Sequence, residues 1–167
     1  MMTRKISGLA LAVALALLGT AAFAQTGIVG GKGFDMVKRF LEDCSKNGAF
    51  FIATVDEEGH PRVRPFGAVA EHEGRLYLCT GKGKAVYRQI KAAPKVEISG
   101  VVDGEWIRLT TELVEDERRE AKQAVLDQNP DLKGMYAVDD DVFAVLYMKG
   151  SQAEILSFAG RHDIIRF

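Results

Sequence analysis

The stretch LYLCTGKGK at residues 76–84 leads directly into AVYRQI at residues 85–90. The first stretch predicts a strand that ends in a threonine, two glycines and two lysines, and the second predicts the start of a helix. A helix N-terminus offers unpaired N–H groups and the positive end of the helix dipole, and glycine lets the backbone approach an anion closely. These residues therefore predict a phosphate-binding site. The candidate contacts are Thr80, Gly81, Lys82 and Lys84.

Residues 51–66, upstream of this stretch, predict two strands joined by an acidic glycine turn. Arg62 and Arg64 share one face of the second strand because side chains alternate along a strand. Both arginines could therefore reach one cofactor or its phosphate. The alternative is a solvated edge strand, because the prolines at 61 and 65 are residues that sheets tolerate mainly at their edges.

Two segments show the period of an amphipathic helix. The first is expected from Asp35, its N-cap, to Gly48, where it stops. Its apolar residues at i, i+3, i+4 and i+7 are Val37, Phe40, Leu41 and Cys44. The second segment spans about residues 116–128 and is stopped by Asn129-Pro130.

Alternating apolar and polar residues predict the remaining strands. A hairpin is expected from 95–101 and 105–113, joined at Asp103-Gly104, and three short strands are expected around 142–148, 153–158 and 163–167. Strands that follow one another through tight turns, with a few helices between them, indicate an α+β, mainly β fold with an antiparallel sheet or barrel. No βαβ alternation or dinucleotide-binding glycine pattern is present, which argues against a doubly wound nucleotide fold.

Residues 1–24 have the pattern of a secretory signal peptide. Arg4 and Lys5 precede an apolar run, and Ala22-Phe23-Ala24 is a cleavage pattern before Gln25. The alternative is an uncleaved anchor, because the apolar run is nearly long enough to span a bilayer. Cleavage leaves residues 25–167 as one domain, periplasmic or secreted, without a stable membrane anchor.

The charge balance excludes one class of partner. Lys and Arg number 22 against 23 Asp and Glu, and the expected signal peptide contains basic residues but no acidic ones. A protein that binds nucleic acid through the phosphate backbone needs a basic face. We therefore expect no nucleic-acid partner.

Cysteine and histidine give no sign of a metal site. Cys44 and Cys79 each lie on an apolar face, which predicts two separate buried thiols, with a disulfide as the alternative. The histidines are far apart in sequence and are expected at the surface: His60, His72 and His162. No Ser-His-Asp or Cys-His arrangement is present either, so the sequence identifies no catalytic side chain.

The order of these segments resembles a known family. An Ala-Thr-Val strand, an acidic turn, PRVRPFG at 61–67, Thr80 and Lys84, and PKVEI at 94–98 resemble the pyridoxamine 5'-phosphate oxidase-like proteins of the FMN-binding split-barrel family. The similarity is greatest to small stand-alone members, including those compared with nitroimidazole reductases. It extends from the first helix to the last strands. The resemblance implies a six-stranded antiparallel Greek-key split barrel with flanking helices, and a homodimer with FMN in each of two interface grooves.

The resemblance also implies roles for individual residues. The backbone of residues 62–65 is expected beside the isoalloxazine, which adds Val63 to the two arginines as a cofactor contact. Thr80 and Lys84 match the residues that hold the phosphate, and Lys82 is a further candidate.

Trp106 is the last candidate contact. It alternates with Ile107 and Leu109, so it points away from the core that these two residues supply. An outward tryptophan needs cover from a partner subunit or from a flavin edge. The alternative is a tryptophan that caps the core from a turn.

The C-terminus limits the function that the resemblance implies. True pyridoxamine phosphate oxidases have extended termini and an arginine-containing C-terminal segment that grips the substrate phosphate, whereas this chain ends in RHDIIRF at 161–167. We therefore expect not vitamin B6 oxidation but an exported FMN-dependent oxidoreductase that reduces a small organic acceptor, of nitro or quinone type. One alternative is a carrier of flavin or heme, and another is a scaffold that has lost the pocket. Thr80, Gly81 and Lys84 argue against the scaffold.

Overall fold

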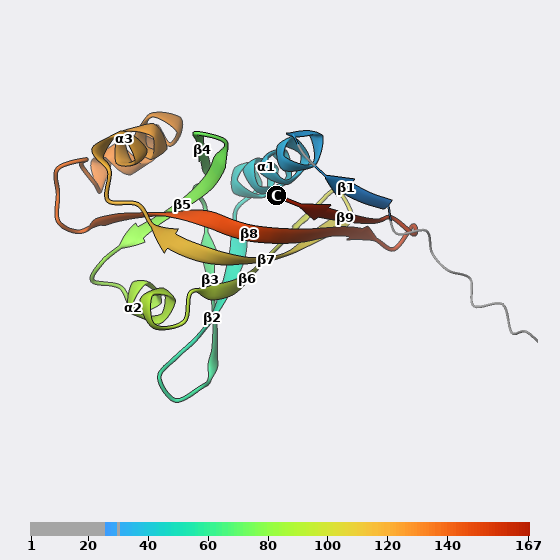
Figure 1. Cartoon of the computed structure of the whole chain (residues 1–167), viewed down its shortest axis with the longest axis horizontal. Helices are drawn as coiled ribbons and strands as arrows, with labels where there is room; N and C mark the ends of the chain where they lie inside the picture. Colours follow the sequence, from blue (N-terminus) through green and yellow to red (C-terminus); the bar gives the residue numbers. More distant parts are fainter. Residues whose placement is uncertain (1–25, 30) are drawn as a thin grey trace, which may run out of the picture.

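A mainly antiparallel sheet organises the chain (Figure 1). The computed structural model describes residues 26–29 and 31–167, so the expected signal peptide lies outside the described residues. The strand order is β1-β9-β8-β7-β6-β2-β3, with β5 paired to β8 and β4 paired to β5. The strands are β1 Thr26–Val29, β2 Phe50–Val55, β3 Pro61–Phe66, β4 Ala70–His72, β5 Arg75–Gly81, β6 Lys95–Val102, β7 Glu105–Glu115, β8 Phe143–Ser157 and β9 His162–Arg166.

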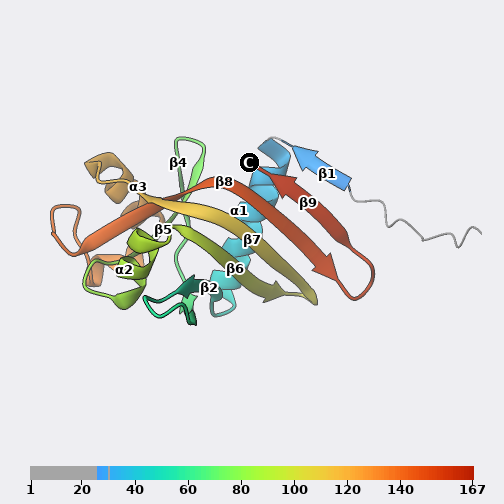
Figure 2. The ribbon, with the colours of Figure 1, turned by 60° about the horizontal axis from the view of Figure 1, so that its bottom comes forward.

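In the described part of the chain, three α-helices and one 3-10 helix flank the sheet: α1 Gly31–Lys46, α2 Ala85–Ala92, α3 Arg119–Gln128 and η1 Pro130–Gly134. Helix α1 lies against the sheet near β1 and β9, whereas α2 and α3 lie toward its other end (Figures 1 and 2). The α+β, mainly β class is therefore confirmed. The strand count is not, because the described part of the chain contains nine strands rather than six. Two of the additional strands, β1 and β4, are four and three residues long, too short to show alternation in sequence.

Strand β8 corrects the prediction of two separate strands at 142–148 and 153–158. It is one strand of 15 residues, and its pairing with β7 slips by one residue between Thr110 and Glu112. Gly150, with φ of 62°, lies at this β-bulge. The polar residues that suggested a turn therefore form the bulge. The continuous strand pairs with β5 over its first half and with β9 over its second half.

Two helix starts also differ from their predicted positions. Helix α1 begins at Gly31, so Asp35 lies inside the helix and is not its cap, whereas the stop is confirmed near Gly48, which has φ of 135°. Helix α3 begins at Arg119 and not at Asp116, because the carboxylate of Asp116 is engaged by Tyr77 and Arg118. The hairpin between β6 and β7 is confirmed.

The core consists of two clusters of buried side chains. The larger cluster lies between α1 and the sheet and includes Leu41, Ile98 and Leu109, and the smaller lies under α3 and includes Tyr77 and Phe143. Cys44 belongs to the first cluster and Cys79 to the second, and both thiols are free. The prediction of two separate buried cysteines is confirmed. Within residues 26–29 and 31–167, no helix has the length and apolar character needed to cross a membrane.

Candidate functional site

A cavity of about 670 Å³ lies where β3, β5 and the segment after α3 meet. Its volume falls within the range of about 300–1,000 Å³ that small-molecule sites occupy. Its lining comes from three parts of the chain. The residues are Arg64–Ala68, then Cys79, Thr80 and Lys84–Val86, and then Gln128–Leu132, Met135 and Tyr136.

Two of the predicted phosphate contacts line the cavity where β5 leads into α2. Thr80 is 3% exposed, and its hydroxyl makes no hydrogen bond within the described part of the chain. Lys84 lies in extended conformation immediately before the first residue of α2, and its ammonium forms no ion pair with the described residues. A hydroxyl and an ammonium without protein partners at a helix N-terminus can both bind an anion.

Gly81 lies beneath the cavity and allows a close approach of two side chains. A Cβ at this position would lie 3.2 Å from the Tyr136 Oη and 3.7 Å from the Lys84 Cε. The first distance is shorter than normal van der Waals contact. Glycine at 81 therefore makes room for the wall of the cavity as well as for Lys84.

Arg64 brings a positive charge that forms no ion pair with the carboxylates of residues 31–167. Its Nη1 donates to the Thr54 Oγ1 at 2.5 Å, and its Nη2 donates to the Gln89 Oε1 at 2.8 Å. The Thr54 hydroxyl also donates to the Gln89 Oε1 at 2.6 Å. Burial and the neighbouring charge of Arg62 lower the pKa of Arg64, yet an arginine stays protonated in proteins. The guanidinium is therefore oriented by neutral groups and keeps its charge for a ligand. Sequence reasoning had not assigned Gln89 to the site.

Besides Gly81, four predicted contacts are not among the residues that line this cavity: Arg62, Val63, Lys82 and Trp106. The Arg62 Nε lies 2.7 Å from Asp56, so only one of the two arginines on this strand lines the cavity. Asp56 also accepts from the backbone N–H groups of Glu58 and His60, and this turn fixes the carboxylate that attracts Arg62.

The other three residues outside the cavity have different surroundings. Val63 is 65% exposed on the edge strand β3. The Lys82 ammonium lies 3.2 Å from the buried carboxylate of Glu115, on a different side of the turn from Lys84. Trp106 lies on β7 with its ring centroid 4.9 Å from that of Phe158, so an exposed aromatic residue of the β8–β9 turn covers part of it. Their contact with a cofactor remains a prediction.

Sequence reasoning missed the third wall of the cavity. Asn129-Pro130 was interpreted only as a helix stop, but the segment from Gln128 to Tyr136 lines the cavity. The Tyr136 ring stacks on Phe143 at 4.8 Å, which holds this segment against β8. A signal was available, because Leu132, Met135 and Tyr136 have helical i, i+3, i+4 spacing directly after the stop.

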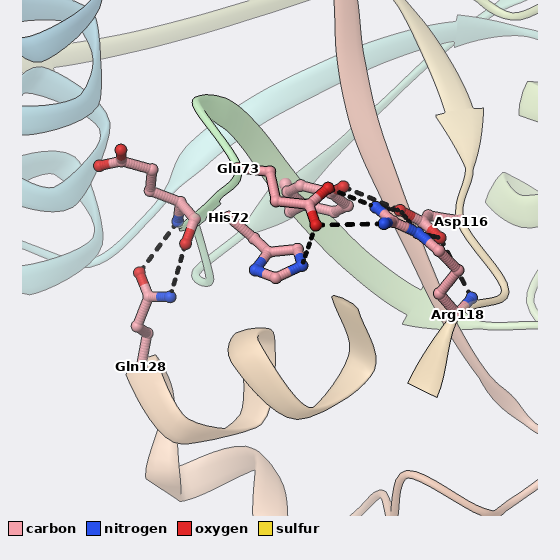
Figure 3. Close-up of polar contacts among 7 residues, drawn as sticks. His72, Glu73, Asp116, Arg118 and Gln128 are labelled. Carbon is pink, nitrogen blue, oxygen red and sulfur yellow. Dashed lines mark hydrogen bonds and ion pairs between the residues drawn. The ribbon is translucent and has the colours of Figure 1, made fainter. Parts of the chain in front are cut away.

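Helix α3, which carries this wall, is attached to the hairpin of β4 and β5 (Figure 3). Arg118, just before α3, donates to Glu73 at 2.9 Å and to Asp116 at 2.8 Å. Asp116 also accepts from the buried Tyr77 hydroxyl at 2.8 Å. His72 lies half-buried beside this network, and its Nε2 is without a hydrogen-bond partner. His72 was expected at the surface and is only partly exposed, with 21% of its side chain accessible.

One group of side chains elsewhere has the spacing of metal ligands. Asp56, Glu58 and His60 offer ligand atoms within 4.8 Å of one another. The Asp56 carboxylate already accepts hydrogen bonds from the backbone N–H of His60 and from Arg62, and the other two residues are exposed. This group is explained by the turn that joins β2 to β3.

Comparison with known proteins identifies the family. The family model for pyridoxamine 5'-phosphate oxidase matches residues 35–149. The chain belongs to this family. The match contains both the β5–α2 turn and the third wall of the cavity. Comparison with curated proteins gives no significant match.

Solved structures agree with the family assignment. The chain is 44% identical to a NimC/NimA family protein from Clostridium acetobutylicum, with a TM-score of 0.75, over 81% of this chain and 94% of that chain. A heme binding protein from Mycobacterium smegmatis shares 18% identity and a TM-score of 0.61, over 82% and 59% of the two chains. The heme storage protein HutZ from Vibrio cholerae shares 16% identity and a TM-score of 0.54, over 70% and 91%. The last two similarities show the fold alone.

The Asp116 network predicts a loss of stability in acid. Tyr77 and above all Arg118 lower the pKa of Asp116 to about 2, from 3.8. The ionised carboxylate therefore stabilises the fold above about pH 4, and this contribution is lost as the pH falls toward 2. Because Arg118 is 46% exposed and solvent screens its charge, we expect this contribution to the free energy of unfolding to be about 1–2 kcal/mol.

Denaturant unfolding of the wild type and Asp116→Asn between pH 6 and 2.5 measures this contribution. The variant should be less stable at pH 6, and the difference should shrink as the pH falls. Asp141→Asn, at an exposed residue without an ion pair among residues 31–167, is the control. A difference for Asp116→Asn that is independent of pH would contradict the prediction.

Proposed function

We propose that this chain binds FMN in the cavity lined by Arg64, Thr80 and Lys84, and that it reduces a small organic acceptor of nitro or quinone type. One observation carries the proposal: two parts of the chain bring an ammonium, a guanidinium and a hydroxyl to one cavity, and neither cation forms an ion pair among residues 31–167, although Asp131 also lines the cavity. Lys82, by comparison, forms an ion pair with the buried carboxylate of Glu115.

The residues of the cavity suit the two chemically different parts of FMN. The cationic groups and the N-terminus of α2 match a phosphate, whereas Phe66, Leu132 and Tyr136 offer apolar and aromatic surface for a planar ring system. The volume of about 670 Å³ is sufficient for a ligand of this size.

The protein contributes binding, orientation and electrostatics. FMN, when bound, supplies hydride transfer. Thr54 and Gln89 hold the Arg64 guanidinium in place, so its charge is oriented before a ligand arrives. The chain's residues, in this proposal, select an anionic ligand and fix its position, and no side chain is required to act as an acid or a base.

A heme carrier is the second candidate, because two proteins of the same fold are named for heme binding or storage. The cationic groups of the cavity suit the phosphate of FMN. No histidine lines the cavity, and burial raises the pKa of the Cys79 thiol to about 11, which keeps the thiol protonated and a poor ligand for iron, so Met135 and Tyr136 are the lining side chains that could ligate heme. An absorption spectrum of the purified protein distinguishes flavin, heme and neither. Anaerobic reoxidation of the reduced flavin by nitro and quinone compounds then distinguishes an enzyme from a carrier.

The proposal includes export and a homodimer. Export is supported by the sequence pattern of residues 1–24 alone. The homodimer is supported by apolar side chains on the outer face of β2, β3 and β6, whose exposed fractions range from 44% to 69%. These are Phe51, Val55, Val63 and Val101. Strand β3, which carries Arg64, is the edge of the sheet, so a second chain placed there would border the cavity.

Removing the Lys84 charge tests the phosphate site. A charge-assisted contact to phosphate contributes about 1.5–3 kcal/mol, so Lys84→Ala should weaken FMN binding by about ten- to a hundredfold. Riboflavin lacks the phosphate, and its dissociation constant should be nearly unchanged. Lys95→Ala, which removes an exposed lysine from the start of β6, is the matched control. Equal losses for FMN and riboflavin, or no loss for either, would place Lys84 away from the phosphate.

Light scattering tests the homodimer. We expect about twice the mass of the processed chain at micromolar concentration, with an interface of roughly 2,000 Å² or more. Val63→Lys places a charge on the outer face and should shift the protein toward the monomer. Val142→Lys changes a valine of similar exposure, 52%, outside the β2–β3–β6 face and should not. A monomeric wild type that binds FMN tightly would refute the dimer and leave the cavity in place.

A further inference from the structure

Two side chains at the C-terminal end of α3 attach the third wall of the cavity to strand β4. The Gln128 Oε1 accepts from the backbone N–H of Glu71 at 2.9 Å, and the Gln128 Nε2 donates to the carbonyl oxygen of Glu71 at 2.8 Å (Figure 3). The Asn129 Nδ2 donates to the carbonyl oxygen of Val69 at 3.2 Å. One glutamine thus pairs with both backbone groups of a residue 57 positions away.

The amide of Gln128 is used within the protein, although Gln128 lines the cavity. Its Nε2 also donates to the carbonyl oxygen of Ala124 at 3.1 Å. An amide nitrogen has two N–H groups, so both are engaged. Gln128 therefore holds the wall in place, and its polar group is not directed at a ligand.

This pairing connects two walls of one cavity. Residues Arg64–Ala68 line one side, and the chain continues from them through Val69 into β4. Residues Asn129–Leu132, Met135 and Tyr136 line another side and follow Gln128 directly. The Gln128–Glu71 pair and the Asn129–Val69 contact therefore join the two walls.

The other end of α3 has an attachment of its own. Arg118 pairs with Glu73 and Asp116, and Ala121 and Val125 are buried under the helix. Loss of the Gln128 amide should therefore leave α3 docked through these contacts and loosen the segment that follows it, which keeps the contact of Asn129 with Val69 and the stacking of Tyr136 on Phe143.

We propose that Gln128 is a positioning residue that sets flavin affinity by holding the wall from Asn129 to Tyr136 against β4. The inference rests on the proposed function, because the ligand is taken to be a flavin. The wall supplies Leu132 and Tyr136, apolar surface suited to the ring system. Displacing this wall should therefore weaken the binding of FMN and of riboflavin alike, whereas loss of Lys84 should weaken the binding of FMN alone.

The test compares Gln128→Leu with Gln123→Leu. Gln123 lies on the same helix, is exposed, and donates to Asp127 at 2.9 Å instead of to the sheet. Hydrogen exchange in the ligand-free protein reports on the wall, through the amides of Leu132, Met135 and Tyr136, which are hydrogen-bonded within the segment. Gln128→Leu should accelerate their exchange about three- to tenfold and raise both flavin dissociation constants by a similar factor. Gln123→Leu should change neither.

A third variant distinguishes positioning from a general structural role. In Gln128→Glu a neutral carboxylic acid can accept from the Glu71 N–H and donate to the Glu71 carbonyl, as the amide does. The carboxylate cannot donate. Riboflavin affinity relative to the wild type should therefore be reduced at pH 7 and recover as the pH falls toward about 4.5, near the ordinary pKa of glutamate.

Each outcome decides the proposal. Unchanged exchange in Gln128→Leu would overturn it whether or not flavin binds. Faster exchange with unchanged flavin affinities would show that the wall is held by Gln128 but does not set affinity, which also overturns it. A wild-type chain that binds no flavin would overturn the proposed function and the flavin part of this inference, while the exchange comparison would still decide the attachment.

Discussion

Strand β8 is the strand on which the rest of the sheet depends. One of its edges pairs with β7 along most of its length, and its other edge pairs with two different strands, one in each half. Its first half pairs with β5, which leads to Thr80 and Lys84, and its second half pairs with β9. Phe143, at its start, stacks on Tyr136 of the third wall. One strand thus sets the relative positions of the larger core, the cluster under α3 and the cavity.

The charges of the cavity are distinctive because the rest of the interior pairs its charges. The buried carboxylate of Glu115 has two lysine partners, and Asp116 has Arg118. Burying an unpaired charge costs free energy, so an unpaired charged side chain is tolerated in a fold where a ligand or solvent can reach it. Arg64 meets this condition at the cavity, where Thr54 and Gln89 orient it without neutralising it. The same arrangement is the basis for proposing that the cavity binds an anion.

Local patterns in the sequence predicted the features that depend on neighbouring residues. The features that were missed depend on contacts between residues far apart in the sequence. Thr80 and Lys84 were found because a strand end, glycines and a helix start lie within a few residues of one another. The third wall was missed because its place depends on Gln128 and Glu71, which are far apart in sequence. Arg62 was assigned with Arg64 from strand alternation, but Asp56 draws it to the turn, and alternation says nothing about competing partners. Strand β8 was divided in two because a bulge and a turn use the same residue types.

The bulge at Gly150 also constrains how the length of this chain can change during evolution. Before it, the even-numbered Leu146 and Met148 face the larger core, and after it the odd-numbered Ala153 and Ile155 do so. The bulge absorbs one extra residue and so causes the change from even to odd numbering, and the side chains before and after it face the same core. Removing that residue would restore regular alternation and leave the later side chains of β8 on the same face, whereas adding or removing one residue elsewhere in β8 would turn them to the opposite face. Related sequences can therefore lose a single residue at the bulge, as they can change length in exposed turns such as that between β2 and β3, but insertions and deletions of a single residue should be rare in the rest of β8.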